Sequence, residues 1–459
     1  MITLKKITLH AVLSAFASLV YMHAAVAGIA VEHWSQPSGA EVFLVQSHAI
    51  PMVDVQLDFD AGSRRDPAEQ AGLASVTASL SGLGVLANPA RGEAALDENA
   101  LGEAWADLGA SFGGHASSDR MSFALRTLTY PDLLAQAVQL AARQLAEPAF
   151  PADIWQRERE TMIAAIKEAN TRPATLAQRA FDQAVYGAHP YGYDTTEASL
   201  QRIEVAQMAA LYRQSIQPCR AKVTLVGALT RAQADTLVTQ LLARLTDLKT
   251  AVASSCPALP AVAEVAPLTQ ASEQRMAFDS AQAHVLLGQP GYKRSDPDFF
   301  AMLVGNYILG GGGFVSRLTH EVREKRGLSY SVYSYFEPGL HAGAFTIGLQ
   351  TRPDQANQAL QVSREVLARF VADGPTEVEL QAAKDNLIGG FALRLDSNRK
   401  LLDNVANIAW NNLPLDYLDT WTQRVQKITV ADIRAAFQRK LQPEKMVTVV
   451  LGGVQRAAQ

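Results

Sequence analysis

The sequence predicts an α+β protein made of two homologous domains, each a mainly antiparallel sheet packed on helices. Three observations lead to this prediction. The chain has 459 residues, which is more than one ordinary hydrophobic core organises. Segments with strand-like alternation and segments with helical periodicity are mixed along it. Several short patterns of the first half return in the same order in the second half.

The internal repeat is clearest near the end of each half. The matched segments are 203–206, 217–218 and 223–227 in the first half, and 428–431, 442–443 and 448–452 in the second. All three pairs have the same offset, and a further pair, 122–132 and 344–354, has nearly the same one. Chance similarity is the alternative. Agreement between separate offsets favours duplication of one α+β unit.

The elements of the first half follow from periodicity and turn residues. Strands are predicted over 41–45, 53–59, 110–118, 120–128 and 222–226, and helices over 71–86, 98–108, 131–145, 152–170, 175–185 and 205–215. Residues 246–272 are rich in Ala, Pro, Ser and Val and are weakly periodic, so they are interpreted as a linker. The predicted domains are therefore 28–245 and 273–459.

The first 27 residues have the pattern of a secretory signal peptide. Lys5 and Lys6 precede an apolar run, and Ala25-Val26-Ala27 forms a small-x-small cleavage site. A membrane anchor is the alternative, although the run is short. We therefore expect a periplasmic or secreted protein with no membrane span after signal cleavage.

Charge and cysteine content restrict the function further. The formal net charge of −4 gives no reason to expect nucleic acid as a partner. The two cysteines, Cys219 and Cys256, are placed in an oxidising compartment by the signal peptide. A disulfide and two separate thiols are both compatible with this sequence, and the spacing fits no metal-binding pattern.

Residues 310–335 carry the most distinctive local pattern. A glycine run, Gly310–Gly313, is expected to form a tight turn; no Lys-Ser or Lys-Thr follows it, which argues against phosphate binding. A helix follows, with Val315, Leu318 and Val322 on one face, and Gly327 is expected to end it. A strand is predicted from Tyr330. Arg323 and Tyr330 are thereby brought together around one turn.

Residues 322–330, Val-Arg-Glu-Lys-Arg-Gly-Leu-Ser-Tyr, resemble the Leu-Arg-x-Lys-x-x-Leu-x-Tyr motif of the pitrilysin/insulinase family of zinc peptidases. The resemblance covers nearly the whole mature chain. It implies two domains that face each other across a cleft. It also implies that Arg323 and Tyr330 hold substrate near the cleaved bond. Without it, Arg323 would be a charge at a helix end and Tyr330 an ordinary strand residue.

The same family has an inverted zinc-binding motif, His-x-x-Glu-His, after Gly-Leu-Ala. Here Gly72-Leu73-Ala74 is present, but the two His positions are Ser75 and Ser79 and the Glu position is Ala78. The third ligand, a Glu eight residues before a Pro, becomes Ala165.

These four degenerate positions cannot bind zinc, since an alanine methyl is no ligand and a neutral serine hydroxyl is a poor one. Glu158, at the position of a companion Glu, is interpreted as a retained structural or surface carboxylate. Small residues packing a former site are the favoured interpretation of the serines. A serine nucleophile is the weaker one, and Gly109-Ala-Ser-Phe-Gly113 lacks the strand-to-helix order of a nucleophile elbow.

The strand predicted over 110–118 aligns with the family's active-site edge strand, to which an extended substrate adds as another strand. The resemblance makes Gly113, Gly114, His115 and Ala116 candidate substrate-binding residues. The two glycines would permit close backbone approach. His115 is equally compatible with a substrate contact and with a turn residue.

Together these features predict a zinc-free subunit of a heterodimeric periplasmic zinc peptidase. The chain would supply Arg323, Tyr330 and half of a chamber for unfolded peptides. A catalytic partner with the His-x-x-Glu-His motif would hold the zinc, so no cofactor is expected on this chain. The alternative, from another functional class, is a non-proteolytic scaffold or peptide-binding protein with the same fold.

Overall fold

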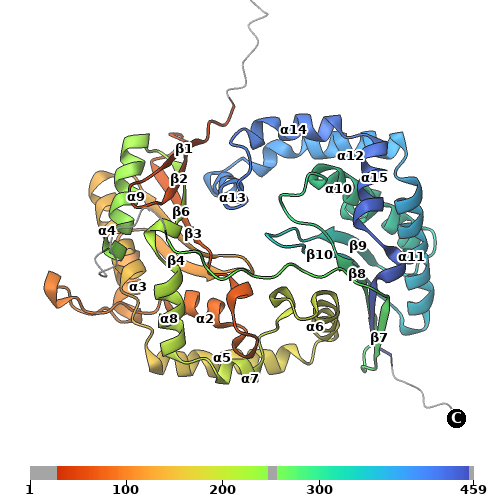
Figure 1. Cartoon of the computed structure of the whole chain (residues 1–459), viewed down its shortest axis with the longest axis horizontal. Helices are drawn as coiled ribbons and strands as arrows, with labels where there is room; N and C mark the ends of the chain where they lie inside the picture. Colours follow the sequence, from red (N-terminus) through yellow and green to blue (C-terminus); the bar gives the residue numbers. More distant parts are fainter. Residues whose placement is uncertain (1–27, 247–255, 454–459) are drawn as a thin grey trace, which may run out of the picture.

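The structure, a computed structural model, describes residues 28–246 and 256–453. The predicted signal peptide and part of the predicted linker lie outside these residues. Figure 1 shows two halves whose sheets face each other, with the linker running from one half to the other. Within the described ranges, no helix combines the length and the apolar character needed to cross a membrane.

The first half contains a six-stranded sheet in the order β1-β2-β6-β3-β5-β4. Its strands are β1 (Glu32–Ser35), β2 (Glu41–Gln46), β3 (Met52–Phe59), β4 (Ser111–Ala116), β5 (Met121–Leu128) and β6 (Lys222–Gly227). Only β2 and β6 pair in parallel; the other neighbours are antiparallel. The apolar residues of β3, such as Val55 and Leu57, face the core formed with the helices.

The second half contains a five-stranded sheet in the order β7-β11-β8-β10-β9. Its strands are β7 (Ser272–Met276), β8 (Ala283–Pro290), β9 (Ser331–Phe336), β10 (Ala344–Thr351) and β11 (Val447–Leu451). Again one neighbouring pair, β7 and β11, is parallel and the rest are antiparallel. Strands β7, β11, β8, β10 and β9 thus repeat the arrangement of β2, β6, β3, β5 and β4. This repeated topology confirms the predicted α+β fold with two homologous domains.

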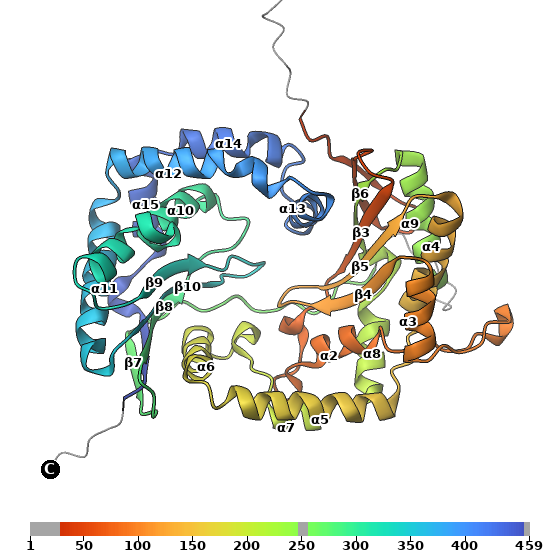
Figure 2. The same cartoon turned by 180° about the vertical axis from the view of Figure 1, so that it is seen from behind.

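Most helices lie on the outer sides of the two sheets, and one helix of each half lies between the halves (Figure 2). Those of the first half are α2 (Leu73–Leu80), α3 (Glu98–Asp107), α4 (Pro131–Ala146), α5 (Ala152–Ala169), α6 (Pro173–Tyr186), α7 (Glu197–Gln201), α8 (Val205–Ser215) and α9 (Arg231–Thr246). Those of the second half are α10 (Phe299–Asn306), α11 (Ala356–Asp373), α12 (Glu377–Gly389), α13 (Asn398–Trp410), α14 (Tyr417–Lys427) and α15 (Val430–Lys440).

Several predicted boundaries need correction. The helix expected over 71–86 is confined to Leu73–Leu80, because Gly72 and Gly84 adopt positive φ angles of 104° and 139° that end it on both sides. Strands β1 and β7 and helix α9 were not predicted. Helix α9 reaches Thr246 and β7 begins at Ser272, so each occupies one end of the predicted linker.

Each half contributes one helix to the sheet of the other half. Helix α6 packs on β8 and β11, where Phe181 is fully buried. Gly288 of β8 makes room for it, since a β-carbon there would lie 2.8 Å from the Phe181 ring. Helix α13 packs on β3 and β6, and the Lys222 ammonium donates 2.7 Å to the carbonyl of Ala409 near its C-terminal end. The two halves are therefore interlocked (Figures 1 and 2).

The beginning of the described part of the linker is fixed to the first half. Cys219 and Cys256 form a disulfide with a Cα–Cα distance of 5.6 Å, which decides the alternative that the sequence left open. Further along, the guanidinium of Arg65 donates 2.9 Å to the carbonyl of Pro260. A hollow of about 290 Å³ opens between the halves, with Tyr186 and Tyr191 on one side and Glu337 on the other.

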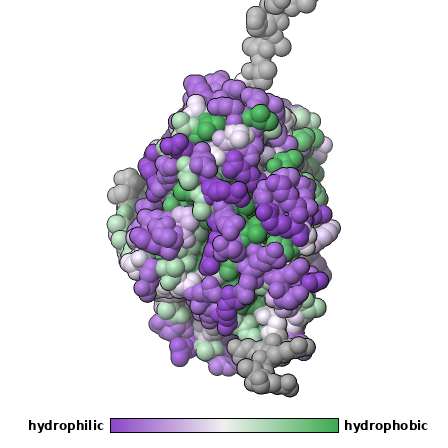
Figure 3. Space-filling model, turned by 90° about the vertical axis from the view of Figure 1, so that its right-hand side faces the viewer, coloured by the Kyte–Doolittle hydropathy of each residue, from purple (hydrophilic) through white to green (hydrophobic). Residues whose placement is uncertain are grey.

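Figure 3 views the molecule from the side of the second half. Hydrophilic residues dominate this face, and hydrophobic ones lie between them in narrow patches. The apolar residues of the second half are concentrated instead in its core, around Phe345, Phe370 and Phe437.

Candidate functional site

The positions that would carry a zinc site lie on α2 and α5. Ser75 and Ser79 are exposed and share one face of α2, whereas Leu73, Val76 and Leu80 face the core. The expectation that the serines pack a former site is therefore wrong, because this face of the helix is open. Their side chains are not held by the core.

The two alanines complete the degenerate set. Ala78 is fully buried, and its carbonyl accepts a hydrogen bond of 2.6 Å from the Ser81 hydroxyl. Ala165 on α5 is exposed. Zinc in this fold needs two imidazoles and a carboxylate, and these four side chains offer two neutral hydroxyls and two methyl groups. The residues present do not fit the metal.

Metal-ligating side chains do not gather elsewhere in the described ranges either. There, no cluster of three or more His, Cys, Asp or Glu residues has a geometry suited to a metal ion. Glu158, the retained companion carboxylate, forms an ion pair of 3.0 Å with Arg157 on the surface of α5. This arrangement agrees with its interpretation as a surface carboxylate.

Strand β4 lies at the edge of the first sheet and pairs only with β5. Its side chains alternate, so the four candidate residues divide between two faces. Gly113 and His115 point outward, whereas Gly114 and Ala116 face α2 and the core. A β-carbon on Gly114 would lie 2.9 Å from the carbonyl oxygen of Ala78, whereas one on Gly113 would meet nothing within 4 Å. At Gly114, the missing side chain therefore lets the backbone of β4 lie close to α2.

His115 lies within β4 opposite Ser122, so its interpretation as a turn residue is wrong, and its role as a substrate contact stays a prediction. Its pKa is lowered, first by desolvation beside β5, while the negative charge of Asp58 opposes the shift. Charges of Arg399 and Asp403 on α13 also act on it, so it lies near the second half. A neutral imidazole between the halves can both donate and accept a hydrogen bond.

The segment before Arg323 differs from the predicted turn and helix. Residues Tyr307–Gly311 and Thr319–Glu324 form two π-helical segments, a conformation often found at functional sites. Leu318 and Val322 are buried as predicted, but Val315 is 74% exposed, so its placement on the same apolar face is wrong. The reason is a separate 3₁₀ turn, Gly313–Val315, which directs this residue to solvent.

Gly327 ends this segment as predicted. Gly327 has a φ of 60°, and its N–H donates 2.9 Å to the Arg323 carbonyl, which closes the helical turn. The glycine run is not one tight turn, because Gly310 and Gly311 end the first π-helical segment and Gly313 begins the 3₁₀ turn. A β-carbon on Gly310 would lie 2.4 Å from the Ser334 hydroxyl on β9.

Arg323 and Tyr330 do meet, and a third residue joins them. The guanidinium carbon of Arg323 lies 4.7 Å from the Tyr330 ring centroid and 4.7 Å from the Phe314 ring centroid. Both rings are largely exposed, Tyr330 by 82% and Phe314 by 69%. Two exposed aromatic rings thereby contact one half-buried cation.

The carboxylates near Arg323 have other polar partners. Glu321 accepts from Lys325 at 2.7 Å and from Arg326 at 2.8 Å, and these bonds lower its pKa to about 2. Glu324 lies 2.9 Å from the His320 ring. Among the residues that the structure describes, no carboxylate pairs with Arg323. Its N–H groups are therefore available to a ligand.

Arg323 and Tyr330 open onto a groove with a volume of about 510 Å³. The lining residues all belong to the second half and come from the π-helical segments, the glycine run and β9. None of the degenerate zinc positions and no residue of β4 lines it. The structure does not bring the two predicted sites of this chain together in one pocket.

The sequence reasoning missed three aromatic residues of the groove. Phe314, Tyr333 and Tyr335 line it, and the two tyrosines stack with centroids 5.8 Å apart. The alternation Ser-Val-Tyr-Ser-Tyr placed the tyrosines on one face of a strand and could have identified them. An aromatic residue directly after a glycine run was the available signal for Phe314.

Comparisons with known proteins address the family. Residues 41–199 match the family model described as Insulinase (Peptidase family M16), and residues 202–387 match the one described as Peptidase M16 inactive domain. The crystal structure of a peptidase M16 inactive domain from Pseudomonas fluorescens is 34% identical, and the match covers 93% of this chain and 100% of that chain, with a TM-score of 0.84. The chain belongs to the insulinase family, peptidase family M16.

Other M16 relatives carry different descriptions. The non-peptidase homolog YmxG of Helicobacter pylori is 26% identical over 405 residues, covering 85% of this chain and 87% of that protein. An uncharacterized zinc protease of Streptomyces coelicolor is 36% identical over 171 residues, which is 37% of each chain. The match thus spans only about a third of the length of the first curated relatives, 37% and 35%.

Proposed function

We propose that this M16 family member is the zinc-free subunit of a heterodimeric periplasmic peptidase. A partner chain with the His-x-x-Glu-His motif supplies the metal and the general base. This chain supplies Arg323, Tyr330 and half of a chamber for unfolded peptides. The match of residues 202–387 to the inactive domain, and the description of one relative as a non-peptidase homolog, support a non-catalytic role.

One observation carries the proposal. The Arg323 side chain is held between two exposed rings, at 4.7 Å from each, and pairs with no carboxylate of the described residues. Ordering a long cationic side chain and exposing two large aromatic rings costs free energy in the isolated chain. Contacts of Arg323, Tyr330 and Phe314 with a bound ligand would offset this cost.

The roles follow from the chemistry of the two polar groups. The guanidinium stays charged and donates in a fixed fork, which suits carbonyl or carboxylate oxygens of a bound peptide. The Tyr330 phenol donates one further hydrogen bond from a rigid ring, which suits a carbonyl oxygen on which negative charge develops. Neither group cleaves a peptide bond, since both only bind and polarise.

The experiment is co-expression with a secreted partner that has the His-x-x-Glu-His motif. Each chain and the mixture are assayed on an unstructured peptide, and complex formation is followed by size-exclusion chromatography. We expect activity only from the mixture. Arg323→Ala and Tyr330→Phe should lower kcat/KM of the mixture by about tenfold to a hundredfold, with the complex intact.

The matched control is Arg352→Ala, which removes an exposed arginine paired with Asp354 outside the groove. It should leave the activity of the mixture unchanged. Unchanged activity in Arg323→Ala as well would favour the scaffold alternative. Stoichiometric zinc binding or peptide cleavage by the isolated chain would overturn the proposal.

A further inference from the structure

The groove beside β9 has an uneven distribution of charge. Among its lining residues, Arg323 is the single side chain with a formal charge at neutral pH. The others are glycine, valine, phenylalanine or neutral polar residues. Burial raises the pKa of Tyr335 to about 12, so its phenol is neutral there. A ligand in the groove therefore meets one positive charge and no negative charge on the walls.

Phe314 and Tyr330 determine how this charge is presented. The guanidinium carbon lies over two aromatic rings, 4.7 Å from the centroid of each. Cations over ring faces leave the in-plane N–H groups for hydrogen bonding. Because the carboxylates of Glu321 and Glu324 have other partners, no internal acid competes for those N–H groups. The N–H groups of the Arg323 guanidinium can therefore donate to the carboxylate of a ligand.

The wall of the groove suits an extended peptide. Strand β9 is the edge strand of the second sheet and pairs only with β10. Ser331 to Tyr335 line the groove, and Gly310 and Gly311, which have no side chains, line it beside them. A peptide main chain can approach such a surface closely and find main-chain partners along the strand.

We propose that Phe314 is a positioning residue of this groove, and that the groove selects extended peptide segments that carry an acidic side chain beside Arg323. The inference rests on the proposed function, in which a peptide binds at Arg323 and Tyr330, and it adds the class of substrate. The occupant is an Asp or Glu side chain rather than a chain end, because a peptide continuing toward a partner's catalytic site does not terminate in this groove.

The test measures peptide binding to the mature chain without a partner. Fluorescence anisotropy compares three labelled probes of alanine, valine and glycine: one with a central aspartate, its asparagine twin, and the asparagine twin with a free C-terminal carboxylate in place of an amide. We expect the aspartate probe to bind about tenfold tighter than the asparagine twin, as a charge-assisted pair gives. The preference should decrease with salt.

Variants test whether Arg323 causes the preference for the aspartate probe. Arg323→Ala should remove it. Phe314→Ala should reduce the ratio of the two affinities several-fold, and Phe314→Tyr, which keeps the ring, should retain the wild-type ratio. Phe314 is 69% exposed, so its replacement does not disturb a core. Leu393→Ala, at a 67% exposed residue outside the groove, is the matched control and should bind as the wild type does.

Three results would overturn the inference. These are equal affinity for the aspartate and asparagine probes, a preference that survives Arg323→Ala, and preference for the C-terminal carboxylate alone. The proposed function fails separately, when the zinc-bearing partner is not stimulated. Loss of stimulation with the aspartate preference intact rejects the subunit role and leaves the selectivity of the groove standing.

Discussion

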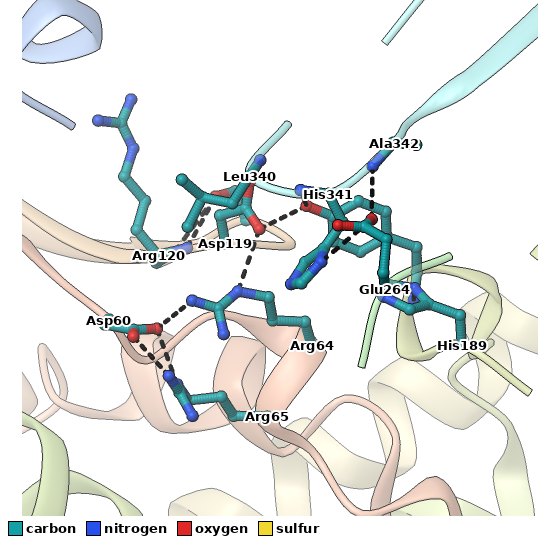
Figure 4. Close-up of polar contacts among 12 residues, drawn as sticks. Asp60, Arg64, Arg65, Asp119, Arg120, His189, Glu264, Leu340, His341 and Ala342 are labelled. Atoms are coloured by element: carbon teal, nitrogen blue, oxygen red, sulfur yellow. Dashed lines mark hydrogen bonds and ion pairs between the residues drawn. The ribbon is translucent and has the colours of Figure 1, made fainter. Parts of the chain in front are cut away.

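The carboxylate of Asp119 in the first half accepts a hydrogen bond of 2.9 Å from the main-chain N–H of Leu340 in the second half (Figure 4). The same carboxylate accepts 2.6 Å from the Tyr191 hydroxyl and 3.1 Å from the Arg64 guanidinium. The Tyr191 oxygen in turn accepts 3.2 Å from the N–H of His341. We call Arg64, Asp119, Tyr191, Leu340 and His341 the junction cluster.

The linker joins the same region. Glu264 accepts 3.1 Å from the N–H of Ala342, next to the junction cluster, and forms an ion pair with Lys293. Burial alone would raise the pKa of Glu264, but the Lys293 ammonium and two main-chain N–H groups lower it to about 2. Together with the exchange of α6 and α13, these bonds hold the two halves of the chain in one arrangement.

Replacing Asp119 tests the contribution of the junction cluster. Asp119→Ala leaves the Tyr191 hydroxyl, the Leu340 N–H and the Nε–H of the buried Arg64 without this acceptor, while Nη2 of Arg64 keeps its ion pair with Asp60. We expect the free energy of unfolding to decrease by about 2–4 kcal/mol, measured by urea denaturation. Hydrogen exchange at 339–342 should accelerate. Asp107→Ala, at an exposed carboxylate at the end of α3, is the control. A loss no larger than that of the control would contradict this account.

Acidification should weaken the junction through His189. Burial lowers the pKa of this histidine, and the charge of His341, whose ring lies 5.1 Å away, lowers it further. Its Nδ1 accepts 3.1 Å from the Tyr191 N–H, which requires an unprotonated nitrogen. The folded pKa is below the unfolded value of 6.5, so this contribution is present above pH 6.5 and lost as pH falls through the folded pKa.

The measurement is the melting temperature as a function of pH. The wild type should lose more stability than His189→Gln between about pH 7 and pH 5, since the glutamine amide does not titrate. His48→Gln, which changes an exposed histidine before β3, should behave as the wild type. Identical pH profiles for wild type and His189→Gln would exclude this role.

Neighbouring glycines on β4 should differ in tolerance. Gly114→Ala places a methyl group 2.9 Å from both the Ala78 carbonyl and the Phe123 ring, so α2 or β4 must shift. We expect a loss of about 1–3 kcal/mol in thermal or urea unfolding. Gly113→Ala meets nothing within 4 Å and should change stability by less than about 0.5 kcal/mol. Equal effects of the two substitutions would show that α2 is not seated against Gly114.

The disulfide should stabilise the fold through the loop that it closes. Cys219 and Cys256 are 37 residues apart in sequence. Closing a loop of this size restricts the unfolded chain, so Cys219→Ser should cost about 2–4 kcal/mol in urea unfolding under oxidising conditions. The double variant with Cys256→Ser should match the single variant, and reducing agent should affect only the wild type. An unfolding curve of the wild type unaffected by reduction would oppose this expectation.

Much of the fold could be predicted because local sequence patterns indicate its strands and helices. The alternation of Val53, Val55, Leu57 and Phe59 identified β3, and strong turn residues delimited most helices. Helix α9 was missed although its bounds contain a helical period, because the repeated strand was interpreted as the last element of the first half. Strand β7 was missed because its residues, Ser-Glu-Gln-Arg-Met, are polar and mostly exposed.

The candidate site was predicted in part. Arg323 and Tyr330 lie together, as their spacing around Gly327 indicated, and Leu318 and Val322 anchor them. Periodicity misplaced Val315 because it assumed one continuous helix where the chain forms a 3₁₀ turn and a π-helical segment. The sequence reasoning also assigned Ser75 and Ser79 to packing, because a sequence does not show what covers a helix face.

The sequence by itself determined the duplication and the loss of the zinc ligands, because both are properties of residue identity. The side chain of an alanine at position 78 or 165 has no lone pair to offer a metal ion, whatever surrounds it. Only the tertiary structure decided three features. These are the packing of α6 and α13 on the sheet of the other half, the junction cluster around Asp119, and the contact of the Phe314 ring with Arg323. Each of these depends on which surfaces meet when segments distant in the chain pack together, and such contacts leave no periodic trace in the segments that make them.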